Sequence, residues 1–346
     1  MPTSPHQDLV ADIGGTNARF ARVGADGRPG EPVKLAVAEY PSLAAAARAA
    51  LERLPGPPVD RAAFAFAGPI TGDAVGLTNA EWSFSIAALR EELGLARLLV
   101  LNDFTALAWS LPLLTPDELR SLVRRAANGA SAGDQNEAIA VPDAPRGLIG
   151  PGTGIGMSGL LPAPAGGWVA IAGEGGHASL APADEREADI VEWARRHHPH
   201  VSIERLVSGS GLPLLHAAVG VVDGYAVDDG AEADDEADPD PVAADITARA
   251  LAGEAHAHAT LSTFCALLGG AAGNLALTLG ARGGVYVGGG IAPRIEAFLQ
   301  ASEFRSRFEA KGRFADYLAA IPTWLIDARA PALRGAAHAL ARSEAS

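Results

Sequence analysis

Asn102 and Asp103 are polar residues placed where α/β proteins bind their ligands. They follow the apolar residues 98–101 and precede a helical pattern of apolar residues that starts at Phe104. Four consecutive apolar residues predict a short buried strand, whose carboxyl end carries Asp103 out of the sheet. Because open α/β sheets bind ligands at this edge, Asp103 is a candidate to contact a substrate. The alternative is that Asp103 only caps the helix by accepting a backbone N–H bond.

A glycine-rich turn near the start of the chain could hold a phosphate group. Residues 9–21 predict a strand, a tight turn and a second strand, and the turn consists of Gly14, Gly15, Thr16 and Asn17. Paired glycines let the backbone turn sharply and direct successive N–H groups at one anion. Asp12, at the end of the first strand, could face a hydrated Mg²⁺ ion. An ordinary hairpin turn is the alternative.

A second glycine-rich turn lies within residues 146–159. Gly154, Gly156 and Gly159 match the G-x-G-x-x-G spacing of dinucleotide-binding folds, which require a helix directly after the glycines. Residues 160–167 contain two prolines and cannot form that helix. The segment therefore predicts a second phosphate-binding hairpin. A dehydrogenase built on these glycines would bind nicotinamide instead, which we do not expect.

Three further segments offer groups to a small ligand. Glu174 and His177, separated by two glycines, form a compact polar corner, although two side chains are too few for a metal site. Glu204 follows Ser202, the predicted N-cap of a short helix, and the helix dipole alone would favour an acid there. The glycine triplet 288–290 ends a predicted strand and suits a flat base or ribose lying against the backbone, with tight packing as the alternative.

Composition narrows the classes of function. The net charge of −14 on 346 residues argues against nucleic acid and anionic membranes as partners. The only cysteine, Cys265, lies in an apolar run, so we expect a buried, inert thiol and no disulfide. The only lysines, Lys34 and Lys311, lack the setting of a P-loop or a protein kinase, so an ATP site would use backbone amides, a metal and arginine. The N-terminus does not resemble a signal peptide, and we expect a cytoplasmic protein.

The order of predicted elements favours a mixed sheet with parallel strands. Residues 114–125 are expected to be helical, and the acidic residues 228–240 to lie in a solvated loop. Residues 259–281 carry no charge and are long enough to span a bilayer. Polar residues within this run and glycines such as Gly269 and Gly273 instead favour a buried helix in close contact with its neighbours.

Taken in order, these motifs resemble those of the bacterial ATP-dependent glucokinases, over residues 9–340. The segments that carry the resemblance are residues 12–19, 102–103, 150–156, 173–177 and 288–291. The related ROK-type sugar kinases usually carry a cysteine-rich zinc motif soon after the histidine. Residues 178–208 contain no cysteine, so the resemblance is to the non-ROK branch.

The resemblance implies an α/β chain with the two-domain actin-like ATPase (ribonuclease H-like) fold, with mixed sheets and an active-site cleft between the domains. The small domain would hold residues 1–111 and 328–346. The large domain would hold residues 112–327, including an acidic loop at 224–242. A homodimer is implied as well.

The implied activity is transfer of the γ-phosphoryl group of ATP to the 6-hydroxyl of glucose, with Mg²⁺ as cofactor. Asp103 would be the general base for the attacking hydroxyl, and Asp12 would hold Mg²⁺ through water. The residues implied to bind the sugar are Asn102, Asp103, Glu174, His177 and Glu204. The residues implied to bind the nucleotide are Asp12, Gly14, Gly15, Thr16, Asn17, Gly152, Thr153, Gly154, Gly156, Gly288, Gly289 and Gly290.

Two other functions remain open from the sequence. The same residues would serve a kinase for another hexose, such as mannose or fructose. A sugar-binding regulator without catalysis is a different class. The presence of Asp103 and both phosphate turns, and the absence of a DNA-binding module before the first strand, count against the regulator.

Overall fold

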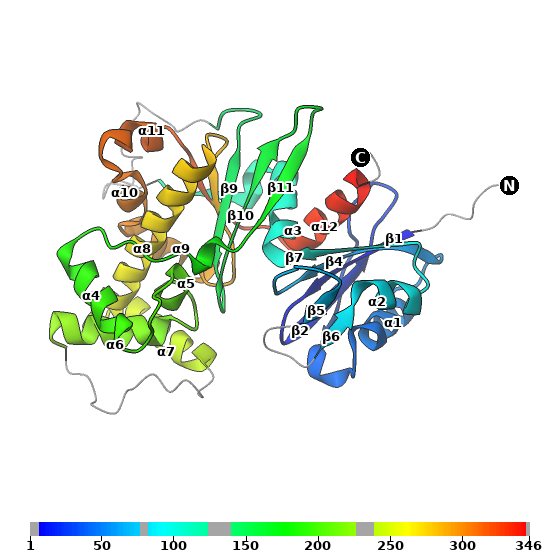
Figure 1. Ribbon diagram of the computed structural model, residues 1–346, viewed down its shortest axis with the longest axis horizontal. Helices are drawn as coiled ribbons and strands as arrows, with labels where there is room; N and C mark the ends of the chain where they lie inside the picture. The colour runs from blue at the N-terminus through cyan, green and yellow to red at the C-terminus, as the bar shows by residue number, and fades with distance from the viewer. Residues whose placement is uncertain (1–6, 77–81, 124–139, 226–238, 344–346) are drawn as a thin grey trace. The chain divides into compact units, whose positions relative to one another are not determined.

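The computed structural model describes residues 7–76, 82–123, 140–225 and 239–343 (Figure 1). The chain divides into two compact units, which we describe separately. Unit 1 comprises Met1–Pro116, Ala170–Ala172 and Ala328–Ser346, and unit 2 comprises Asp117–Val169 and Gly173–Asp327. The sequence placed the first change between domains at residues 111–112, whereas the contacts place it at residues 116–117.

Unit 1 is built on a five-stranded mixed sheet. In spatial order its strands are β3 (Val33–Ala36), β2 (Asn17–Arg22), β1 (Gln7–Ile13), β4 (Val59–Phe66) and β7 (Arg97–Asn102). β1, β4 and β7 are parallel, whereas β2 pairs antiparallel with β1 and with β3. The carboxyl ends of the three parallel strands therefore meet at one edge of the sheet.

Both faces of this sheet are buried. Leu9, Ala11 and Ile13 of β1 pack in one hydrophobic cluster with residues of the helices α1 (Leu43–Arg53) and α2 (Ile86–Glu92), whereas Val10 packs in another with residues of α12 (Pro331–Arg342). Side chains alternate between the faces of a strand, so burial on both faces explains why residues 9–11 and 13 of β1 are all apolar. The helices and the short hairpin of unit 1 are α1, α2, α3 (Asp103–Ser110), α12, β5 (Ala74–Gly76) and β6 (Ser83–Ser85).

A glycine brings α12 against α3, the helix that begins with Asp103 (Figure 1). A Cβ atom on Gly335 would overlap the carbonyl oxygen of Ala106 and would lie 2.9 Å from the backbone nitrogen of Ser110. The two helix backbones therefore touch at Gly335. Any side chain at this position must push the helices apart.

A six-stranded sheet supports unit 2, and residues Ala170–Ala172 of its edge strand β11 (Trp168–Gly173) are grouped with unit 1. In spatial order its strands are β11, β10 (Ile155–Pro162), β9 (Arg146–Pro151), β12 (Val285–Val287), β13 (Thr323–Ile326) and β8 (Leu119–Ser121). β12 is parallel to β9 and β13, whereas β10 and β8 are antiparallel to β9 and β13, respectively. The helices of this unit are α4 (Glu185–Arg195), α5 (Ile203–Leu206), α6 (Leu212–Asp223), α7 (Pro239–Leu251), α8 (Ala255–Leu279), α9 (Glu296–Ala301), α10 (Phe304–Glu309) and α11 (Ala315–Ala319).

The uncharged run of the sequence forms the long helix α8. Among the described residues it is the one helix long and apolar enough to cross a membrane, yet 72% of its most apolar window is buried within the protein. A Cβ atom on Gly273 would lie 2.5 Å from the carbonyl oxygen of Phe308, and one on Gly269 would overlap that of Phe304. Cys265 is fully buried on this helix, and burial raises the pKa of its thiol to about 12. The predictions of a closely packed buried helix and an inert thiol are confirmed.

Two local predictions were wrong. A helix was predicted at residues 114–125, but the described residues 114–123 contain the 3-10 turn Pro116–Glu118 and the strand β8, which pairs with β13. The backbone groups of β13 are satisfied by this distant strand, and long-range pairing of that kind overrides a local helical pattern. The acidic loop predicted at 224–242 ends earlier, because α7 begins at Pro239. Most of that loop, residues 226–238, lies outside the described residues.

A stack of aromatic rings joins α6 to α8. The rings of His216 and His256 are 3.6 Å apart between centroids, and His256 also stacks on Tyr225 at 4.7 Å. Burial lowers the pKa of His216 to about 4, and His256 and Arg249 act in the same direction. Glu254 and Asp245 act in the opposite direction but do not prevail.

Because of His216 in this stack, the folded protein should become less stable in acid. The pKa of His216 is lower in the folded protein than the ordinary value of 6.5, so its contribution to stability is full above pH 6.5 and is lost as the pH falls towards 4. Because the ring is only partly buried, we expect the free energy of unfolding to decrease by about 2 kcal/mol as the pH falls from 6.5 towards 4. Urea unfolding of His216→Gln at pH 7 and pH 5 should show a smaller loss than the wild type. His258→Gln, which changes an exposed ring on α8, should behave as the wild type does.

Candidate active site

Unit 1 brings Asp12 and Asp103 to the same edge of its sheet. In the strand register Asp12 pairs with Ala65 of β4, and the next residue of β4, Phe66, pairs with Asn102. Only β4 separates β1 from β7, and neighbouring strands lie about 4.8 Å apart, so the two strand ends are roughly 10 Å apart. Two carboxylates at that spacing leave room for a phosphoryl group and a hydroxyl between them.

Asn102 rather than Asp103 is the N-cap of α3. Its Oδ1 accepts the N–H groups of Phe104 (2.9 Å) and Thr105 (3.2 Å), and its Nδ2 donates to the carbonyl of Gly68 (3.2 Å). Asp103 is the first helical residue, and its Oδ1 also accepts the Phe104 N–H at 2.9 Å. Capping is therefore assigned to Asn102, whose second amide hydrogen has no partner among the described residues. Asp103 lies where the partial positive charge of a helix N-terminus favours a carboxylate.

Asp12 has the surroundings expected of a residue that faces a cation. Burial raises the pKa of its carboxyl above the usual value, and the Arg19 guanidinium, 3.5 Å away, opposes this effect. The adjoining turn closes with a hydrogen bond from the Gly14 N–H to the Asn17 carbonyl (3.0 Å), and Thr16 at its tip is exposed. A single carboxylate beside a turn that could hold phosphates fits Mg²⁺, which keeps most of its waters and binds phosphate oxygens.

In unit 2, Glu204 joins the second glycine turn to the predicted sugar-binding residues. Glu204 is the second residue of α5, whose N-cap is Ser202, as predicted. One carboxylate oxygen, Oε2, accepts the Ile155 N–H at 3.0 Å, and the other, Oε1, lies 3.8 Å from Nδ1 of His177. A Cβ atom on Gly154 would overlap Oε2 of Glu204. A side chain at position 154 would therefore displace the Glu204 carboxylate from its present place.

The polar corner lies in the same part of unit 2. Glu174 and His177 are both exposed, at the ends of the 3-10 turn Gly175–His177. Between them, a Cβ atom on Gly176 would overlap the carbonyl oxygen of Ile155, which explains a glycine here. Carboxylate oxygens and imidazole nitrogens are suitable partners for sugar hydroxyls. Unit 2 thus places His177 beside Glu204, and Glu174 at the other end of the same short turn.

A cavity of about 370 Å³ in unit 2 opens between the two glycine segments predicted to bind nucleotide. Gly152 and Thr153 line it from the β9–β10 turn, and Gly290 lines it from the loop after β12. A Cβ atom on Gly290 would meet no atom within 4 Å, whereas Gly289 has a φ of +79° and packs directly on the Pro151 carbonyl. Gly289 is therefore required by the backbone, and Gly290 exposes bare backbone to the cavity.

The remaining walls of this cavity were not found from the sequence. Apolar residues of α7, among them Ala244 and Leu251, form one side, and Arg294 lies at another. From the sequence, an apolar helix face that lines a cavity cannot be told from one that packs in the core, and Arg294 belongs to no recognisable motif. A cavity of this size with apolar walls and one guanidinium suits a nucleoside with a phosphate near its edge.

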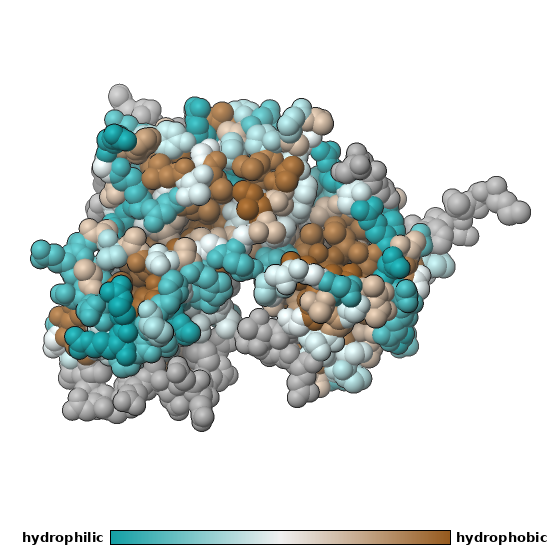
Figure 2. All heavy atoms as spheres, in the orientation of Figure 1, coloured by the Kyte–Doolittle hydropathy of each residue, from teal (hydrophilic) through white to brown (hydrophobic). Residues whose placement is uncertain are grey.

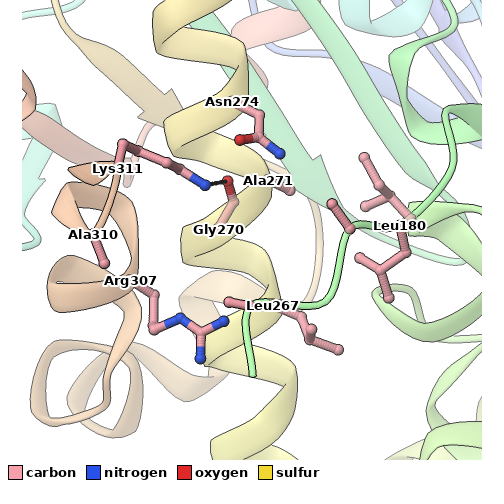
Figure 3. A pocket seen from close by; sticks show the side chains of 11 residues that line it. Leu180, Leu267, Gly270, Ala271, Asn274, Arg307, Ala310 and Lys311 are labelled. Atoms are coloured by element: carbon pink, nitrogen blue, oxygen red, sulfur yellow. Dashed lines mark hydrogen bonds between the residues drawn. The ribbon is translucent and has the colours of Figure 1, made fainter. Parts of the chain in front are cut away.

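Lys311 lies elsewhere in unit 2 and has a structural role. It lines a cavity of about 30 Å³ beside α5, and its Nζ donates to the carbonyl of Gly270 at 3.0 Å (Figure 3). Arg307 in the same cavity pairs with Glu187 at 2.7 Å. Burial lowers the pKa of the Lys311 amine. A space this small holds a water molecule or two and no sugar or nucleotide.

Comparison with known proteins places these observations in one family. The sequence profile of the family described as Glucokinase matches residues 9–343. A glucokinase of Chromobacterium violaceum is 51% identical to the chain over 334 residues, which is 96% of this chain and 89% of that protein. The bifunctional protein glk of Burkholderia thailandensis is 47% identical over 98% of this chain, which spans only 50% of that longer protein.

The fold agrees with that of a solved structure. A crystal structure of glucokinase from an Antarctic psychrotroph has a TM-score of 0.82 and 34% identity, and the alignment covers 98% of this chain and 100% of that one. The predicted α/β fold class and the resemblance to the non-ROK glucokinases are confirmed.

Proposed function

The chain belongs to the glucokinase family, and we propose that Asp103 is the general base in its transfer of the γ-phosphoryl group from ATP to glucose. The chain is an ATP-dependent glucose kinase that makes glucose 6-phosphate and ADP. The observation that carries the assignment of Asp103 is its place, with Asp12, at the carboxyl edge of one sheet. A carboxylate for the sugar and a carboxylate for the metal are thereby held at the ends of two strands, β7 and β1, with β4 between them.

Asp103 accepts the proton of the 6-hydroxyl as the oxygen attacks the γ-phosphorus. A bond forms between that oxygen and phosphorus, and the bond from phosphorus to the bridging oxygen of ADP breaks. Because such a transition state needs mainly alignment and charge neutralisation, the chain contributes position more than covalent chemistry. Mg²⁺, held near Asp12, supplies positive charge to the phosphate oxygens when bound.

Glu174, His177 and Glu204 hold the other sugar hydroxyls in this proposal, together with Asn102. The carboxylate of Glu204 is already oriented by its hydrogen bond from Ile155 and so need not be ordered by the sugar. A sugar that lacks a hydroxyl would leave such groups unpaired, which is the basis for selecting one hexose over another.

The nucleotide lies along the two glycine turns in this proposal. Phosphates contact the turns at residues 14–17 and 152–156, and the adenosine enters the cavity at Gly290. We also propose that the enzyme acts in the cytoplasm as a homodimer, on the strength of the family resemblance alone.

A side chain at position 290 should weaken nucleotide binding selectively. Because its Cβ would point into open space, Gly290→Val should fold normally while narrowing the cavity, and we expect the KM for ATP to rise about tenfold or more. The KM for glucose at saturating ATP should stay within about twofold. Steady-state kinetics with each substrate varied in turn would show this. An unchanged KM for ATP would place the adenosine elsewhere.

Substrate and reaction can be tested together by measuring ADP release from Mg-ATP across a panel of hexoses, with a control that lacks sugar. Strong release with glucose alone is the expected result. Release with mannose or fructose instead would keep the mechanism and change the acceptor. A folded protein that binds glucose but releases no ADP would support the sugar-binding regulator.

A further inference from the structure

The connection between α5 and α6 contains the segment Ser208, Gly209, Ser210, Gly211. Each of its two glycines packs closely against the backbone of another segment. A Cβ atom on Gly209 would lie 3.0 Å from the Gly152 carbonyl oxygen, and one on Gly211 would lie 2.5 Å from the Arg205 carbonyl oxygen. The alternation of glycine and serine therefore lets one short segment touch the β9–β10 turn and α5 at once.

On the side of the turn, the contact consists of hydrogen bonds. The Gly209 N–H donates to the Gly152 carbonyl at 2.8 Å, and the Ser210 N–H donates to the Thr153 carbonyl at 3.0 Å. The Ser210 hydroxyl donates to the same Thr153 carbonyl at 2.9 Å. These are two of the residues assigned above to the nucleotide, so their backbone is held by this segment.

On the side of α5, the contact depends on one buried hydroxyl. Ser208 is completely buried, and its Oγ donates to the Glu204 carbonyl at 2.7 Å and accepts the Gly211 N–H at 2.9 Å. Its Oγ also lies 3.1 Å from that of Ser210. Each hydroxyl has one hydrogen, and these are used by the Glu204 and Thr153 carbonyls, so the contact between the two oxygens is secondary.

We propose that Ser208 is a positioning residue that holds the sugar-binding carboxylate of Glu204 and the nucleotide-binding turn in one fixed arrangement. The bond from Ile155 to Oε2 of Glu204 is a second tie between the same two elements. Loss of the Ser208 hydroxyl would leave the Gly211 N–H and the Glu204 carbonyl unpaired in a buried site, so α5 and the segment would shift. The residues proposed to bind glucose and those proposed to bind ATP would then both be displaced. The proposal rests on the proposed function, because it assumes that these residues bind sugar and nucleotide.

Ser208→Ala should raise the KM for glucose and the KM for ATP together, each about tenfold, while kcat changes less. Ser208→Thr keeps the hydroxyl and should recover much of both affinities. Ser210→Ala removes only a hydroxyl bond to Thr153, so it should raise the KM for ATP about threefold and leave that for glucose unchanged. Because Ser210 is exposed, this variant should fold even where Ser208→Ala does not.

Ser302 provides a matched control. Its hydroxyl donates to the Leu299 carbonyl at 2.7 Å and accepts the Phe304 N–H at 3.1 Å, so it makes a similar pair of backbone bonds away from the candidate site, although Ser302 is only partly buried. Ser302→Ala should lower the melting temperature without changing either KM. If Ser208→Ala likewise affects only the melting temperature, or if Ser210→Ala leaves both KM values unchanged, the positioning role is wrong. A wild-type protein without hexose-dependent ADP release would instead overturn the proposed function, so the two failures are distinguishable.

Discussion

Asp103→Asn should lower the turnover of glucose about 10³-fold and leave glucose affinity within about threefold. Asparagine has nearly the same shape and can keep the hydrogen bond from the Phe104 N–H that Asp103 accepts at 2.9 Å. It cannot accept the proton of the 6-hydroxyl, so only the chemical step should suffer. Stopped-flow measurement of ADP formation and calorimetric titration with glucose would separate the two effects.

Asp184→Asn is the matched control for this variant. Asp184 is the N-cap of α4, where its side chain accepts the Glu187 N–H at 2.8 Å, so the same change is made at another helix N-terminus. It should lower stability slightly and leave turnover unchanged. Full turnover in Asp103→Asn would remove Asp103 as the base and leave it only a role in binding.

Gly335→Ala should destabilise unit 1 by about 3 kcal/mol, a large effect for one methyl group. The added Cβ would overlap the Ala106 carbonyl oxygen, so α12 and α3 must separate. The change in free energy corresponds to a melting temperature lower by roughly 10 °C for a unit of this size. Because α3 begins with Asp103, we also expect reduced kcat at temperatures where the variant is still folded. Differential scanning calorimetry and kinetics at 15 °C would measure both.

Gly270→Ala shows whether the effect is steric. Gly270 also lies within a helix, but a Cβ atom there would meet no atom within 4 Å. Alanine is the better helix former, so this variant should be as stable as the wild type or slightly more stable. If both variants lose equal stability, the close approach of α12 to α3 is not the cause.

Local patterns predicted those parts of the fold that neighbouring residues determine. The strand, turn and strand at residues 9–21, and the change from strand to helix at Asn102, follow from apolar periodicity and glycine placement. Residues 114–125 were mispredicted because the partner of β8 is β13, where Arg120 pairs with Leu325. No pattern within a short segment reveals a partner so distant in the chain.

The candidate site likewise contains features that local patterns predict and features that depend on residues distant in the chain. Glycines and acids in short motifs pointed to most of the candidate residues, whereas Glu204 was included because the family resemblance implies it. The close contact between Gly154 and the Glu204 carboxylate could not be predicted, because Glu204 lies fifty positions further along the chain. The α7 wall of the nucleotide cavity and Arg294 were missed because neither forms a motif. The link at Ser208 was missed because a buried serine in a short connection has no recognisable spacing.

Figure 2 shows apolar residues, in brown, gathered in patches among polar residues on the visible face. The chain's thiol is not among the exposed groups: Cys265 is fully buried, with a pKa of about 12. Since it is the only cysteine in the sequence, a reagent such as dithionitrobenzoate has a single target. Cys265 belongs to unit 2, whereas Gly335 belongs to unit 1. The rate of thiol labelling therefore measures how often unit 2 opens enough to expose Cys265. In Gly335→Ala, a faster rate would show that disruption of unit 1 also loosens unit 2.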